Sequence, residues 1–390
     1  HPEYPTYNKT KPSMQKPYRL FLPVLLFFCI AGPKAAYPKI PAEPALQTEP
    51  ERAVNVEGKD AALTERDFLF GDDRPFKQCH ASTLVGLDDG NFLVAWFGGD
   101  KESADNVAIW LSKAKPGNWP APRRVAKIRD DAHWNPVLFR DGKGKVYLFF
   151  KAGKKITEWE TWWTASSDDG TTWSKPVELV KGDRGGRGPV RNKPIVLSNG
   201  VWLAGASFEG ETGDKHWDVF VDRSSNNGRT WKATPFLELD RSNFRGHGVI
   251  QPTLWESEPG IVHMLVRSSN ARIYRSDSKD YGKSWCPLYP TDMPNNNSGI
   301  DLIKLPDGVL VLAYNPVGGD AGSRSLLNLA VSFDNGKTWP KTIALENDNP
   351  PAEYSYPAII AHGDRVAVTY TWNRQRIVFW EFANDALEAR

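Results

Sequence analysis

Short runs of apolar residues, separated by polar turns, occupy most of the chain from residue 76 onward. Several runs follow an Asp-Gly or Asn-Gly pair, which is typical of a β-hairpin turn. No amphipathic pattern long enough for a helix of about twelve residues occurs in that span. The pattern therefore predicts an all-β domain, and among its strands we expect Phe92–Phe97, Val107–Leu111, Val146–Phe150, Val201–Ala204, Val262–Val266, Val309–Tyr314 and Val366–Tyr370.

One eight-residue phrase, Ser-x-Asp/Asn-x-Gly-x-Ser/Thr-Trp, occurs four times. The copies begin at Ser166, Ser224, Ser278 and Ser332, which separates them by 58, 54 and 54 residues, and a degenerate copy runs from Ser112 to Trp119. The short acidic or amide side chain accepts backbone hydrogen bonds and the Gly adopts positive φ, so each copy predicts a self-supporting turn. A period of this length in a β-rich chain is typical of propeller blades, and residues 76–390 have room for about six.

Composition limits the possible functions. The chain has 390 residues, of which 40% are hydrophobic, so it can form a sizeable core. Its formal net charge of +2 gives no electrostatic basis for nucleic-acid binding. The sequence contains no metal-ligand spacing, no phosphate-binding glycine loop and no Gly-x-Ser-x-Gly motif, so we expect neither a metal nor a cofactor.

The first residues resemble a targeting segment. Basic residues, the last of them Arg19, precede the apolar run Leu20–Ala31, and small residues follow. This pattern predicts that residues 1–36 comprise a signal peptide and the residues upstream of it. The alternative is a short uncleaved anchor. Residues 37–62 are rich in Pro and Ala and predict a linker, so the propeller is expected at 63–390. We therefore expect a secreted or periplasmic protein with no stable membrane span after cleavage.

Two cysteines, Cys79 and Cys286, would remain after such a cleavage. An exported protein can form a disulfide, but these residues fall in different predicted blades. The sequence leaves their pairing open.

The repeated phrase resembles the Asp-box of the sialidase (neuraminidase) superfamily, whose members form a six-bladed β-propeller. The resemblance covers residues 76–385 and implies a carbohydrate-active enzyme with a glycan substrate. In that family the boxes are structural turns away from the substrate.

The resemblance also implies site residues. Sialidases hold the substrate carboxylate with three arginines and use a Tyr nucleophile. Arg267 ends an apolar strand before the third box and resembles the second arginine, while Arg324 precedes the fourth box and resembles the third. Tyr354 resembles the nucleophile, and Tyr356 would share its face if the segment is a regular strand.

The chain departs from the family pattern at two positions. His80 stands where the family has its first arginine, and Gln251, sixteen residues before Arg267, stands where the family has the Glu that supports the nucleophile. The family's acid/base Asp would come from the loop before residue 106, which makes Asp105 the candidate, with Asp100 or Glu102 as alternatives.

Polar residues precede an apolar strand in other blades, as His80 does in the first. If these strand starts converge on the propeller axis, they add substrate-binding candidates. They are His133, Asn135, Lys193 and Asp301.

Three functions fit these residues. The first is an exo-acting glycoside hydrolase on a terminal acidic sugar, because two arginines can clamp a carboxylate. The second is a polysaccharide lyase on a uronate, in which His80 and Tyr354 supply base and acid. The third is a non-catalytic propeller that binds glycans.

Overall fold

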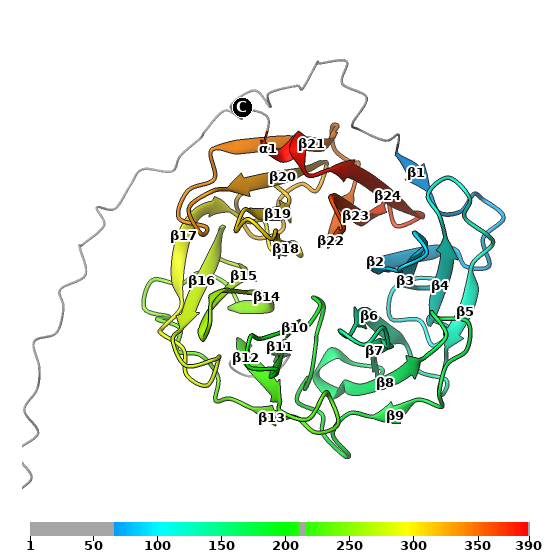
Figure 1. The fold of residues 1–390 in the computed structure, drawn as a ribbon, viewed down its shortest axis with the longest axis horizontal. Coiled ribbons are helices and arrows are strands. Elements are labelled where there is room, and N and C mark those ends of the chain that lie inside the picture. The colour runs from blue at the N-terminus through cyan, green and yellow to red at the C-terminus, as the bar shows by residue number, and fades with distance from the viewer. Residues whose placement is uncertain (1–65, 211–215, 389–390) are drawn as a thin grey trace, which may run out of the picture. The chain divides into compact units, whose positions relative to one another are not determined.

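Six four-stranded antiparallel sheets surround a common axis and form a six-bladed β-propeller (Figure 1). This confirms the predicted fold. The computed structural model describes residues 66–210 and 216–388, all within the unit Arg52–Arg390. The predicted signal segment in 1–36 and linker in 37–62 lie outside the described residues. Within the described ranges, no helix is both long and apolar enough to cross a membrane.

Blades 1 to 5 each use four consecutive strands, numbered outward from the axis, and blade 6 takes its outermost strand from the start of the described chain. Blades 1 and 2 consist of β2 (Gln78–Gly86), β3 (Phe92–Gly99), β4 (Ala108–Ala114) and β5 (Arg123–Ala126), then β6 (His133–Arg140), β7 (Val146–Ala152), β8 (Glu160–Ser166) and β9 (Val177–Glu178). Blades 3 and 4 consist of β10 (Ile195–Val196), β11 (Trp202–Glu209), β12 (Trp217–Ser224) and β13 (Lys232–Ala233), then β14 (Val249–Glu258), β15 (Ile261–Ser268), β16 (Arg272–Ser278) and β17 (Tyr289–Pro294). Blades 5 and 6 consist of β18 (Asp301–Lys304), β19 (Leu310–Tyr314), β20 (Leu326–Ser332) and β21 (Lys341–Asn347), then β22 (Tyr354–His362), β23 (Arg365–Trp372), β24 (Arg376–Ala383) and β1 (Asp67–Phe68). Two short helices, η1 (Ile156–Glu158) and α1 (Asp385–Glu388), complete the described elements.

The first strand closes the ring. β1 pairs antiparallel with β24 and forms the outer edge of blade 6, with Asp67 opposite Phe379 and Phe68 opposite Val378. Residues near the two ends of the described chain therefore share one sheet, and ladder hydrogen bonds hold the last blade to the start of the chain.

The core lies between neighbouring blades. In β3, Phe92, Val94 and Trp96 pack into one hydrophobic cluster, while Leu93, Ala95 and Phe97 pack into another. Successive side chains of a strand point to opposite faces, so both faces of this strand are covered. Burial on both faces explains why such strands read in the sequence as continuous apolar runs rather than as alternating ones.

The four boxes form the same turn, as predicted. In the first, the Ser166 hydroxyl accepts from the Gly170 N–H at 2.8 Å, and Asp168 Oδ1 accepts from the Thr172 N–H at 2.9 Å. Two residues in a row adopt positive φ, Asp169 at 52° and Gly170 at 77°. The Trp173 indole N–H donates to the Gly170 carbonyl, so the ring packs against the core with its polar atom satisfied.

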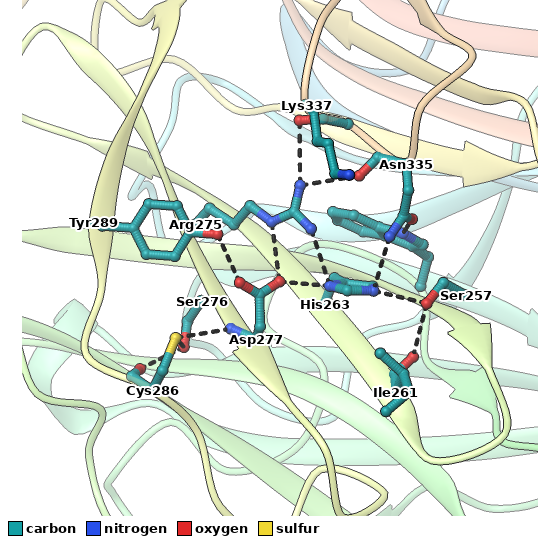
Figure 2. Close-up of polar contacts among 12 residues, drawn as sticks. Ser257, Ile261, His263, Arg275, Ser276, Asp277, Cys286, Tyr289, Asn335 and Lys337 are labelled. Atoms are coloured by element: carbon teal, nitrogen blue, oxygen red, sulfur yellow. Dashed lines mark hydrogen bonds and ion pairs between the residues drawn. The ribbon is translucent and has the colours of Figure 1, made fainter. Parts of the chain in front are cut away.

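A polar network docks the fourth box onto blade 4 (Figure 2). The His263 ring contacts Asp277 through Nδ1, and its Nε2 lies 2.8 Å from Ser257 Oγ and 3.1 Å from Asn335 Nδ2. Asn335 belongs to the box, and Arg275 donates to its carbonyl oxygen at 3.0 Å. The network therefore ties the turn of blade 5 to the strands of blade 4.

Both described cysteines are free. Cys79 is buried in the core that contains Trp96, whereas the Cys286 sulfur lies 3.3 Å from the backbone nitrogen of Asp277 in blade 4. The pairing left open by the sequence is not formed.

Replacing Ser332 with Ala tests the box as a stabilising unit. The Ser332 hydroxyl accepts from the Gly336 N–H at 2.9 Å and is fully buried, so the variant leaves a buried donor unpaired. We expect a loss of about 1–3 kcal/mol in the free energy of unfolding, measured by urea denaturation.

The matched control is Asp334→Asn, which copies the second box, where Asn226 Oδ1 accepts from the Thr230 N–H at 2.9 Å. This control should unfold at nearly the wild-type urea concentration. Equal stability of Ser332→Ala and the wild type would contradict the stabilising role.

Candidate functional site

The innermost strands carry bulges near their axial starts. In β2, β6, β14 and β22 the ladder to the next strand shifts register, and one residue in each bulge adopts positive φ. A bulge turns a side chain out of the regular alternation. The residues so placed are Ala81, Asn135, Gln251 and Tyr356, with φ of 58°, 42°, 58° and 53°.

Tyr356 is the centre of a cationic cluster. The guanidinium carbons of Arg191, Arg267 and Arg324 lie 5.1, 5.6 and 5.9 Å from the centroid of its ring. Arg267 Nη1 donates to its hydroxyl oxygen at 2.9 Å. Burial acts to raise the pKa of Tyr356, but Arg267 and Arg324 outweigh it and hold the pKa below the usual 10. The phenol of Tyr356 therefore loses its proton more readily than a phenol in water.

Arg267 is positioned by neutral acceptors. Its Nε donates to Asn297 Oδ1 at 3.1 Å and its Nη1 to Gln251 Oε1 at 3.0 Å. Gln251, predicted at the position of the family's Glu, therefore orients an arginine here, and an amide cannot accept the phenol proton.

A carboxylate joins Arg324 to another arginine. Glu353 Oε1 accepts from Arg324 Nη1 at 3.2 Å and from Arg374 Nε at 2.8 Å. Arg374 Nη1 also donates to Glu102 Oε2 at 2.7 Å. Burial acts to raise the pKa of Glu353, but Arg374 and Arg324 hold it below its usual value, so this carboxylate stays ionised.

His80 lies inside the cluster. Its ring centroid is 4.1 Å from that of Tyr356, with 32° between the planes, and its Nδ1 lies 3.0 Å from Thr371 Oγ1. Burial, with the nearby Arg374 and Arg324, holds the pKa of His80 well below 6.5. His80 is therefore neutral at neutral pH and does not supply the charge of the arginine it replaces.

Arg191 binds the backbone of the bulge in β22. Its Nη2 donates to the carbonyl oxygens of Tyr356 and Pro357, and only 1% of its surface is exposed. Burial lowers the pKa of Arg191 to about 10, which leaves it charged at neutral pH. Arg191 lies two residues before the candidate Lys193 in the sequence, but it was not among the predicted site residues.

Tyr354 does not join the cluster. Its hydroxyl donates to Asp348 Oδ2 at 3.0 Å, and its ring packs in the hydrophobic core between blades 5 and 6 with Tyr370. Burial and Asp348 raise its pKa to about 12. The expectation that Tyr354 and Tyr356 share a face is wrong, because the bulge between Ser355 and Ala358 interrupts the alternation.

Lys193 and Asp301 bind each other at 2.8 Å within the ring of inner strands. Asp301 also accepts from the Thr253 hydroxyl at 3.0 Å and the Ile359 N–H at 3.0 Å. These contacts join blades 4, 5 and 6. Lys193 lines a cavity of about 560 Å³ formed with the far ends of the inner strands, including Trp255 and His362, rather than the cluster around Tyr356.

The remaining predicted residues have separate surroundings. Asn135 is buried at the bulge of β6. Asp105 is exposed on the loop between β3 and β4, and its backbone carbonyl accepts from Lys127. On the same loop Asp100 pairs with Lys77 at 3.0 Å, while Glu102 is the carboxylate that contacts Arg374. The described residues contain no group of three or more His, Cys, Asp or Glu side chains able to hold a metal ion.

Residues 90–368 match the family described as "BNR repeat-like domain". No curated protein matches the chain in sequence. A protein of unknown function from Dyadobacter fermentans has the same fold, with a TM-score of 0.66 and 16% identity over 82% of this chain and 98% of that one.

Two sialidase structures are also similar. A variant of the NanB sialidase from Streptococcus pneumoniae gives a TM-score of 0.63 and 12% identity over 81% of this chain and 70% of its own. The leech intramolecular trans-sialidase, solved with 2,7-anhydro-Neu5Ac, gives 0.64 and 12% over 83% and 71%. At these identities the likeness shows a shared propeller fold.

His133 provides a test of stability against pH. Its Nε2 accepts from the Ile128 N–H at 2.9 Å and its Nδ1 faces the Asp131 carbonyl at 2.8 Å, so the ring is held neutral. Burial lowers its pKa from 6.5 to about 4. As pH falls, the unfolded chain binds a proton at this residue before the folded protein does, and this stabilises the unfolded state. The free energy of unfolding should therefore fall by about 3 kcal/mol between about pH 6.5 and pH 4 because of His133.

Urea unfolding at a series of pH values measures this loss. His133→Gln, which keeps one donor and one acceptor without titrating, should show a shallower fall in stability over the same range. An identical fall in both proteins would show that His133 is not the titrating group.

Proposed function

This chain belongs to the family of BNR repeat-like domains, and from that premise we propose that it is a sialidase-like exo-glycoside hydrolase that removes a terminal acidic sugar from a glycan. The observation that carries the proposal is the convergence of Arg267 and Arg324 on Tyr356. A guanidinium group matches a carboxylate with two parallel hydrogen bonds, and two such groups beside one phenol select an anionic substrate.

Tyr356 is the proposed nucleophile. Its oxygen attacks the anomeric carbon as the bond to the leaving oxygen breaks, and water then cleaves the tyrosyl–sugar bond and restores the phenol. A substrate carboxylate beside the anomeric carbon would repel an Asp or Glu nucleophile more than a phenol. The phenol proton passes to water before the attack, and the charge of Arg267 and Arg324, rather than a base at Gln251, favours its loss.

Asp105 is the proposed proton donor to the leaving oxygen. The loop between β3 and β4 offers three carboxylates, but Asp100 pairs with Lys77 and Glu102 with Arg374. An ion pair keeps a carboxyl group deprotonated, whereas a general acid must carry a proton. Of the three, only Asp105 forms no side-chain ion pair among the described residues, and Lys127 contacts its backbone carbonyl.

We also propose that the protein is secreted or periplasmic. This rests on the apolar run Leu20–Ala31 behind basic residues in the sequence.

Replacing each of the two tyrosines with Phe in separate variants distinguishes the proposed nucleophile from a structural residue. Tyr356→Phe should lower kcat on aryl glycosides of acidic sugars by about 1000-fold or more, because the nucleophilic oxygen is lost. Tyr354→Phe should keep kcat within about 3-fold and lose some stability, because its hydroxyl bonds only Asp348 in the described structure.

The products decide between the functions. New reducing ends with no rise in ultraviolet absorbance support hydrolysis, while an unsaturated product would show a lyase instead. If the wild-type protein binds glycans without turnover, it is a non-catalytic glycan-binding propeller. Loss of activity in Tyr354→Phe with activity retained in Tyr356→Phe would overturn the nucleophile assignment.

A further inference from the structure

We propose that Arg374, in the turn between β23 and β24, binds the carboxylate of the substrate together with Arg267 and Arg324. The inference rests on the proposed function and adds a specificity-determining residue to it. Arg374 lies in this turn, whereas His80, the position at which the sequence pattern lacks an arginine, lies on β2.

The turn that carries Arg374 is fixed on both sides. Asn373 and Arg374 adopt positive φ of 48° and 58°. The Arg374 carbonyl accepts from the Cys79 N–H at 2.8 Å, beside His80 on β2, and the Asn373 N–H donates to the Glu353 carbonyl at 2.7 Å. The base of this side chain is therefore held between the inner strands of blades 1 and 6.

The guanidinium group of Arg374 lies beside that of Arg324. Both donate to the same oxygen of Glu353, at 2.8 and 3.2 Å. Each side chain is 25% exposed, so neither is sealed in the core. Arg374, Glu102 and His80 also lie close together around one small void. Both cations therefore lie near His80 and bind the same carboxylate.

These arginines have donors to spare. A guanidinium group offers five N–H donors. Among the described residues, Arg374 donates through Nε and Nη1, Arg267 through the same two nitrogens, and Arg324 through Nη1. The Nη2 group of each makes no hydrogen bond within that part of the chain, and a carboxylate is the acceptor that suits grouped guanidinium donors.

The charges around His80 also favour a bound anion. Glu353 and Glu102 are the carboxylates that pair with Arg324 and Arg374, whereas the partners of Arg267 are neutral. His80 adds no charge at neutral pH. Together with Arg191, which lies against the Tyr356 ring, four guanidinium groups face two carboxylates, and the excess of positive charge favours a bound anion such as a substrate carboxylate.

The test compares each acidic sugar with its methyl ester. Aryl glycosides of N-acetylneuraminic, glucuronic and galacturonic acid, each as free acid and as methyl ester, are assayed for kcat/KM and for binding. With the acid that the wild type prefers, Arg374→Ala should lower kcat/KM by about 30-fold or more, because a partly buried charge pair is lost. The ester lacks the charge, so its kcat/KM should stay within about 3-fold.

Two further variants control for charge and folding. Arg374→Lys keeps the charge but not the planar fork, and it should recover part of the loss on the acid. Arg365→Ala removes a cation at the opposite end of the same hairpin, where Arg365 pairs with Glu381 at 3.2 Å, and should leave kcat/KM unchanged. Thermal unfolding of each variant shows whether the fold is intact.

The outcomes separate the two proposals. If Arg374→Ala weakens acid and ester equally, or if its unfolding shows a damaged fold while Arg374→Lys acts like the wild type on both ligands, Arg374 only positions Glu353 and the inference is wrong. If the wild type neither binds nor cleaves any acid better than its ester, the proposed function is wrong, and the inference that rests on it is wrong as well. Selective loss on the acid supports the inference.

Discussion

Guanidinium groups repel one another, yet three of them lie 5.1, 5.6 and 5.9 Å from the centroid of the Tyr356 ring. Such crowding is tolerated only where each cation has its own acceptors. Arg191 has two backbone carbonyls, Arg267 has two amides, and Arg324 shares a carboxylate. These acceptors come from the bulges of β14 and β22 and from the segments just before β18 and β22, so the geometry of the inner strand starts decides where the positive charge lies.

The fold was predictable because it is encoded locally and repeatedly. A box needs only eight residues to form its turn. The spacing between boxes gives the length of a blade and hence the number of blades. The expected strand Phe92–Phe97 lies within β3 because both faces of that strand pack against core, which makes every position apolar. None of this depends on what the axial residues do.

The site was only partly predictable, because its residues are placed by irregular backbone. Arg267 and Arg324 follow from strand ends, and both reach Tyr356. The period of two that links Tyr354 to Tyr356 fails at the bulge. A signal for this was present, since Asn135, Gln251 and Tyr356 each precede a proline, and proline inside a strand is typical of a bulge. Arg374 gave no such signal, because its position depends on a turn that contacts a strand from the other end of the described chain.

The pairing of β1 with β24 has a consequence for the order in which the domain can be completed. Blades 1 to 5 are built from strands adjacent in sequence, so each can form as it leaves the ribosome. β1 is made first among the described strands, but its partner β24 is the last of them, and closing so long a loop carries a high entropic cost. Until β24 emerges the nascent propeller is an open arc with an unpaired edge, and an unpaired edge is a template for aggregation.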